Sequence, residues 1–90
     1  MKVQNMTSSN GNKVANQFII FDSSFTAFQS YDSIIVKTSF DDGERVVELD
    51  EMYWNYSKTT SKYRNQFLGE TTKETQAKID AGIYKLVNLN

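Results

Sequence analysis

Four short runs of β-forming residues, separated by turn signals, limit the folds that this chain can adopt. The runs cover residues 18–21, 25–31, 33–38 and 44–49, and they are rich in β-branched and aromatic side chains. The triplets Asp22-Ser23-Ser24 and Asp41-Asp42-Gly43 between them are typical of tight turns. Tight turns connect antiparallel neighbours, so residues 17–50 predict an antiparallel meander of four short strands.

After Asp50 the pattern changes from strand to helix. Asp50 is placed to cap a short helical turn over residues 51–54. A helix is then expected to end near residue 68, where Gly69 suits the left-handed position that follows a helix. The candidate caps at its start are Ser57, Thr59 and Thr60. Thr71 and Glu74 match a capping box for a second helix that reaches about residue 81.

Residues 83–89 are apolar and β-prone, and they predict a last strand that returns to the sheet. The expected fold class is α+β: an antiparallel sheet of four to five short strands with two helices on one face, in the order ββββ-α-α-β. Residues 1–16 are mostly small and polar without a sustained period, so we expect a flexible N-terminal arm. Residues 17–90 then form one domain of roughly 75 residues, near the lower limit for unaided folding, which would favour a homodimer.

The composition removes several classes of chemistry. The chain contains no cysteine and no histidine, which excludes disulfides, thiolate metal sites and the commonest general base. We therefore expect a protein that is not an enzyme and uses no cofactor or metal. A hydrolase that holds a metal through Asp41, Asp42 and Glu44 is the remaining catalytic alternative, but their spacing matches no calcium loop and suits a turn. No apolar run resembles a signal peptide or a membrane span, so we expect no membrane association and a location in the cytoplasm of a bacterial host cell.

Charge is divided unevenly along the chain, although the net charge is only −1. Residues 17–50 contain seven acidic and two basic side chains, which gives −5, whereas residues 51–90 contain six basic and four acidic ones, which gives +2. Lys2 and Lys13 add two further positive charges. This balance argues against an acidic nucleic-acid mimic and against a polybasic binder, and it predicts one acidic and one mildly basic surface.

Residues 57–68 form the most informative stretch, because they contain three bases and no acid. At about 100° per residue, one side of this helix carries Lys58, Ser61, Lys62 and Asn65. Tyr63 and Phe67 lie on the opposite side and are expected to face the core, with Arg64 flanking the polar stripe. Hydroxyl groups near the start of the helix would add to an anion-binding surface.

Trp54 and Tyr56 precede this helix and are suited to stacking on bases or to filling a pocket on a partner protein. The alternative interpretation is a solvated helix face with the aromatic side chains in the core. The predicted partner-binding residues are Trp54, Tyr56, Lys58, Thr59, Lys62, Arg64 and Asn65.

Three segments carry a family resemblance: FQSYDSII at residues 28–35, YWNYSKTTSKYRNQFLGE at residues 53–70 and GIYKLVNL at residues 82–89. Over roughly residues 17–90 the chain resembles small uncharacterised domains that are encoded by phages and plasmids of low-GC Gram-positive and gut bacteria. This resemblance implies a genomic context and transfers no activity. Small proteins from such genomes often antagonise host defence, as anti-CRISPR inhibitors do, or handle nucleic acid.

These observations lead to two functional hypotheses. The first is a non-enzymatic accessory protein of a phage or mobile element that binds and modulates a host protein. A defence nuclease is one candidate partner, and the chain would then be a defence-system inhibitor of the anti-CRISPR kind. The alternative is a small nucleic-acid-binding module that uses the basic helix at residues 57–68. Either the acidic strand half or the basic helix would serve as the binding face.

Overall fold

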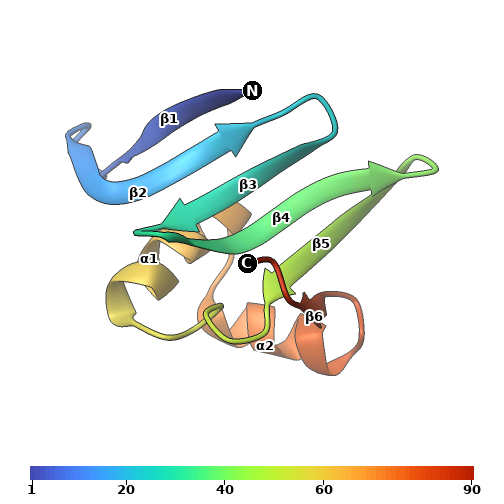
Figure 1. Ribbon diagram of the computed structural model, residues 1–90. Coiled ribbons are helices and arrows are strands. Elements are labelled where there is room, and N and C mark those ends of the chain that lie inside the picture. Colours follow the sequence, from blue (N-terminus) through green and yellow to red (C-terminus); the bar gives the residue numbers. More distant parts are fainter.

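The computed structural model describes residues 1–90 and contains one six-stranded sheet and two helices (Figure 1). The elements are β1 (Lys2–Thr7), β2 (Lys13–Phe21), β3 (Phe25–Ser30), β4 (Ser33–Asp41), β5 (Glu44–Asp50), α1 (Lys58–Leu68), α2 (Thr72–Asp80) and β6 (Lys85–Val87). Strands β1 to β5 follow one another across the sheet as antiparallel neighbours, and β6 pairs in parallel with β5. The α+β class and the predicted meander are therefore confirmed.

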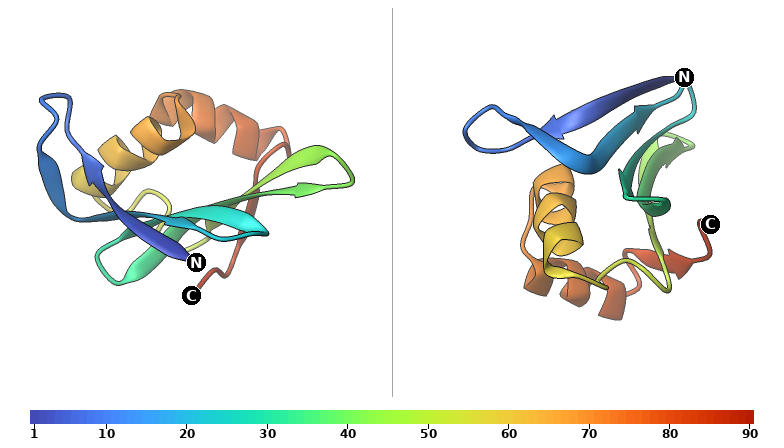
Figure 2. Two further views of the ribbon diagram at one scale, coloured as in Figure 1. Left: turned by 90° about the horizontal axis from the view of Figure 1, so that it is seen from above. Right: turned by 60° about the vertical axis from the view of Figure 1, so that its left-hand side comes forward.

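The sheet curls, and both helices lie on its concave side (Figure 2). The core forms between them from apolar side chains of the central strands together with Tyr63 of α1 and Tyr84. Phe28 of β3 is fully buried and stacks on Phe67 of α1, with ring centroids 6.0 Å apart. Tyr63 and Phe67 thus face the sheet, as their spacing in the helix predicts.

Residues 1–16 form β1 and the start of β2, which pair as a β-hairpin, instead of the flexible arm that their composition suggests. β1 pairs with β2 from Lys2 to Thr7, and Met6 is 3% exposed in the core. The Asn5 side chain donates a hydrogen bond to the carbonyl oxygen of Val14 (3.0 Å), and Gln66 of α1 donates one to the carbonyl oxygen of Thr7 (2.9 Å). The segment is ordered by backbone pairing and by one buried side chain, neither of which a polar composition reveals.

The helix ends follow the local capping rules. Ser57 is the N-cap of α1, and its hydroxyl oxygen accepts a hydrogen bond from the backbone N–H of Thr60 (3.1 Å). Gly69 ends α1 at φ 70°, a left-handed conformation that glycine adopts without a steric penalty. Thr71 and Glu74 form the predicted capping box at the start of α2, with both reciprocal bonds present.

The last segment is shorter than the strand predicted over residues 83–89, because β6 covers only three residues. Beyond it, the chain is held by side chains: Asp50 accepts from the backbone N–H of Leu89 (2.9 Å), and the Asn90 carboxamide bonds both backbone groups of Ile34 (2.8 and 3.0 Å). Asp50 also accepts from Met52 and Tyr53, as a cap should. Burial acts to raise the pKa of Asp50, but these hydrogen bonds outweigh it and hold the pKa below its ordinary value.

Gln17 of β2 is fully buried on the side of the sheet that faces α1. It lies opposite Ser30, whose hydroxyl is 2.8 Å from that of Thr60 in α1. Neither the nitrogen nor the oxygen of the Gln17 carboxamide has a hydrogen-bond partner. A buried polar group without a partner costs free energy, so this side chain weakens the fold.

Replacing Gln17 with methionine, which has a similar length and no polar terminus, should raise the free energy of unfolding by about 1 kcal/mol. Urea unfolding followed by circular dichroism measures the change. Gln29→Met is the matched control and should lower stability, because the Gln29 side chain donates to the carbonyl oxygen of Tyr31 (2.7 Å). A loss of stability in Gln17→Met would show that the carboxamide contributes to folding.

Candidate functional site

Four of the seven predicted partner-binding residues reach solvent at the start of α1. Lys58, Thr59 and Lys62 are exposed on the helix, and Tyr56 is exposed just before it. The Tyr56 ring packs edge-on against Tyr53, with centroids 5.5 Å apart. This end of the molecule thus offers one aromatic ring and two exposed ammonium groups to a partner, although the Lys62 ammonium also lies over the Tyr63 ring.

The other three predicted residues are buried or half-buried, and their side chains make contacts within the fold. Trp54 is half-buried and packs against the core, and the Arg64 guanidinium carbon lies 5.1 Å from the centre of its ring. Arg64 is fully buried, which corrects the prediction that it flanks the solvent-facing stripe. Asn65 is half-buried, and its carboxamide contacts both Arg64 and Thr72.

The Arg64 guanidinium joins three parts of the chain through neutral oxygen atoms. Its Nη1 donates to the carbonyl oxygen of Trp54 and to the Asn55 side chain, while its Nη2 donates to Asn65 and to the Thr72 hydroxyl (2.9 Å each). Burial lowers the pKa of Arg64, and the negative charge of Glu70 opposes that effect. These contacts lock the loop before α1 and the start of α2 onto α1.

Replacing Arg64 with methionine should lower the free energy of unfolding by at least about 2 kcal/mol, because several buried acceptors would lose their donor. Arg64→Lys should recover only part of this loss, since a single ammonium group cannot reproduce the planar fork. The matched control is Lys62→Met, an exposed position on the same helix, where we expect a change within about 0.5 kcal/mol. Chemical unfolding of the three variants distinguishes a structural Arg64 from one that serves a partner.

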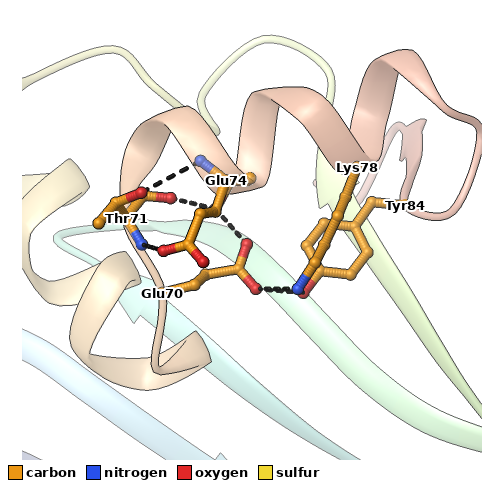
Figure 3. Close-up of polar contacts among 6 residues, drawn as sticks. Glu70, Thr71, Glu74, Lys78 and Tyr84 are labelled. Carbon is orange, nitrogen blue, oxygen red and sulfur yellow. Dashed lines mark hydrogen bonds and ion pairs between the residues drawn. The ribbon is translucent and has the colours of Figure 1, made fainter.

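A second polar cluster joins the start of α2 to the segment before β6 (Figure 3). One carboxylate oxygen of Glu70 accepts from Lys78 (2.9 Å) and from the Tyr84 hydroxyl (2.6 Å), and the other accepts from Thr75 (2.5 Å). Burial acts to raise the pKa of Glu70, but the bonds from Lys78, Thr75 and Tyr84 hold the pKa below its ordinary value. Burial and the bond to Glu70 raise the pKa of Tyr84. The cluster contains an acid, a base and a phenol, and each is occupied in joining α2 to the segments before and after it.

Because the pKa of Glu70 is lower in the folded state, its contribution to stability is complete above its ordinary pKa of 4.5 and is lost as the pH falls through the folded value. Glu70→Gln should lower the free energy of unfolding by about 2 kcal/mol at neutral pH. It should also flatten the decline in stability on the acidic side of pH 4.5, where the native chain loses this contribution. Unfolding measured from neutral to acidic pH tests both, with Glu51→Gln at an exposed position as the control that keeps the native slope.

The opposite end of the molecule carries a different surface, which we call the hairpin end and define as residues 21–26 and 38–45. The β4–β5 hairpin projects beyond both helices (Figures 1 and 2). Its turn consists of Asp42 at φ 55° and Gly43 at φ 84°, the pair of positive angles that a type I′ turn requires. Phe40 beside this turn is 75% exposed. The ring is therefore available for contact with another molecule.

The charged side chains at the hairpin end are Asp22, Asp41, Asp42, Glu44 and Arg45. An open hollow of about 400 Å³ lies between the two turns and is lined by residues 22–26 and 38–40. Phe21 is also exposed, and cross-strand pairing places Thr26 and Thr38 in one row with it. The hairpin end therefore combines four carboxylates with exposed phenylalanine rings. The sequence predicted the turn and its acidic charge. It did not predict that β4 and β5 would extend beyond the helices and place this turn at the end of the molecule.

The acidic side chains are not arranged as a metal site, since no group of three or more metal-ligating residues converges anywhere in the chain. No helix is long and apolar enough to cross a membrane. The geometry thus defines a small α+β domain with two chemically distinct ends, one acidic and aromatic and the other weakly basic.

The chain belongs to a family of unknown function, DUF8033, whose model matches residues 1–82. The match includes the N-terminal hairpin, strands β1 to β5 and both helices, and it ends before β6. No curated protein and no solved structure matches the chain.

Proposed function

We propose that this chain is a non-enzymatic accessory protein of a phage or another mobile element that binds and modulates a host protein. A defence nuclease is one candidate partner, which would make the chain an inhibitor of the anti-CRISPR kind. The genomic context rests on the resemblance in residues 28–35, 53–70 and 82–89. The binding role rests on the surfaces that the fold leaves free.

The hairpin end is the observation that carries this proposal. Phe40 places an exposed aromatic ring on a hairpin that projects from the domain and that carries three carboxylates, with the fourth, Asp22, in the neighbouring β2–β3 turn. Aromatic side chains that fill a pocket on a partner supply much of the binding energy in protein interfaces, while surrounding charges guide the encounter. By contrast, Arg64, Glu70 and Tyr84, whose side chains could take part in chemistry at a site, are hydrogen-bonded to other residues inside the fold.

The burial of Arg64 weighs against the nucleic-acid alternative. Without it, the stripe on α1 retains only two exposed cations, Lys58 and Lys62. Phosphate binding depends on the number of cations that meet the backbone, so this face would give a weak and strongly salt-dependent interaction. The acidic hairpin end would repel nucleic acid.

The protein immobilised through its C-terminal end should retain a host protein from a lysate, and Phe40→Ser should reduce that retention by about tenfold or more. Met52→Ser is the matched control, because Met52 is 74% exposed, nearly the same as Phe40, and lies away from the hairpin end. Quantitative mass spectrometry of the retained proteins measures the effect. Unchanged thermal unfolding of both variants establishes that the fold is intact.

Two results would contradict the proposal. Equal retention by the native chain and by Phe40→Ser would exclude the hairpin end as the contact surface. Binding of labelled DNA or RNA at low salt, abolished by Lys58→Glu with Lys62→Glu but not by Phe40→Ser, would establish the nucleic-acid alternative.

A further inference from the structure

β1 is the edge strand of the sheet and meets a neighbouring strand only on the side of β2. An edge strand presents backbone N–H and C=O groups that are ready to pair with another strand. Natural proteins protect such edges with charges, prolines or bulges. β1 has one charged side chain, Lys2, no proline, and a bulge that begins only after Asn5. Residues 1–5 therefore form a regular, weakly protected edge.

The side chains along this edge continue an apolar surface on the convex face of the sheet. Val3 is 58% exposed and pairs with Ile20, so both side chains lie on the same face. Ile20 lines an open groove of about 400 Å³ together with Ala27, Met1 and Leu89. Met1 is also largely exposed. A strand added beside β1 would extend this apolar surface and pack its side chains beside Val3.

The sequence of β1 suits pairing with itself. In a two-fold antiparallel arrangement centred on Val3, the Val3 side chains of two copies lie opposite each other. Lys2 then faces Gln4 of the second copy, so the only charges on the strand do not meet. The pairing ends at Asn5, where the bulge begins. A second copy of the chain carries the same edge and therefore matches it in this register, whereas an unrelated strand does not.

The size of the core supplies a further reason for a second copy. Only 16 of the 90 residues are buried, and a domain of this size gains a large share of its stability from any further surface that it buries. Two-fold dimers are the commonest way in which small chains do so.

We propose that β1 is the interface of a homodimer, in which two β1 strands pair antiparallel about a two-fold axis at Val3 and join the two sheets. The dimer forms from the purified chain alone and does not depend on the proposed host partner. Sedimentation velocity from micromolar to millimolar concentration should show a monomer–dimer equilibrium for protein without an N-terminal extension. Hydrogen exchange in β1 should slow as the concentration rises, while exchange in α2 should not change.

Val3→Lys and Val3→Glu provide the decisive test, because the two-fold axis places like charges directly opposite each other. Each variant alone should dimerise at least about tenfold more weakly than the native chain, and an equal mixture of the two should recover a mixed dimer. Met52→Lys, an exposed apolar position outside β1, is the matched control and should dimerise like the native chain. Unchanged circular dichroism and thermal unfolding confirm that each variant folds.

The proposal is wrong if the native chain remains monomeric up to millimolar concentration. It is also overturned if Val3→Lys dimerises as strongly as the native chain, or if the Val3→Lys and Val3→Glu mixture does not associate. Loss of dimerisation in Met52→Lys would likewise contradict it, by placing the contact on another surface. None of these results bears on binding at the hairpin end.

Discussion

The buried guanidinium of Arg64 is the interaction on which the arrangement of the helices depends. Its two terminal nitrogens reach the loop before α1, the side chain of Asn65 and the first residue of α2. A buried cation requires acceptors around it, and here neutral oxygens accept from both terminal nitrogens in place of a paired carboxylate, while Nε is buried without a partner. A second network is centred on Glu70, whose carboxylate accepts hydrogen bonds from Thr75 and Lys78 of α2 and from Tyr84. These two networks fix the helices and their flanking segments relative to one another, while apolar contacts such as that of Phe28 with Phe67 hold the helices against the curled sheet.

Because these polar side chains are bonded inside the fold, the groups available for binding other molecules are those that remain on the surface. Arg64, Glu70 and Tyr84 are all hydrogen-bonded within the fold. The surface retains charges that occur singly or in turns, and the exposed rings of Phe40 and Tyr56. Of the two ends, the hairpin end has the denser charge and the more exposed ring. A binding role that uses shape and charge fits this distribution better than a role that uses positioned reactive groups.

Local rules predicted the parts of the fold that depend on neighbouring residues. The Asp42–Gly43 turn, the Thr71–Glu74 capping box and Gly69 at the end of α1 follow from short-range geometry, and each takes the predicted place. Arg64 could not be placed in this way, because its burial depends on acceptors in the preceding loop and in α2. The pairing of residues 2–7 with β2 is equally non-local: one methionine and a backbone ladder order a segment whose composition indicates disorder. For the same reason the sequence predicted the charge of the hairpin end but not its projection.

The two proposed surfaces are compatible in one assembly. β1 lies at the edge of the sheet, whereas the hairpin end lies at the end of its central strands, so pairing at β1 leaves Phe40 and its neighbouring carboxylates free. A two-fold axis that makes the β1 strands antiparallel also makes all other strands of the two copies antiparallel. The hairpin ends of the proposed dimer would therefore point in opposite directions. Such a dimer would bind two separate partner molecules, or bridge two subunits of a partner, rather than engage neighbouring sites on one face.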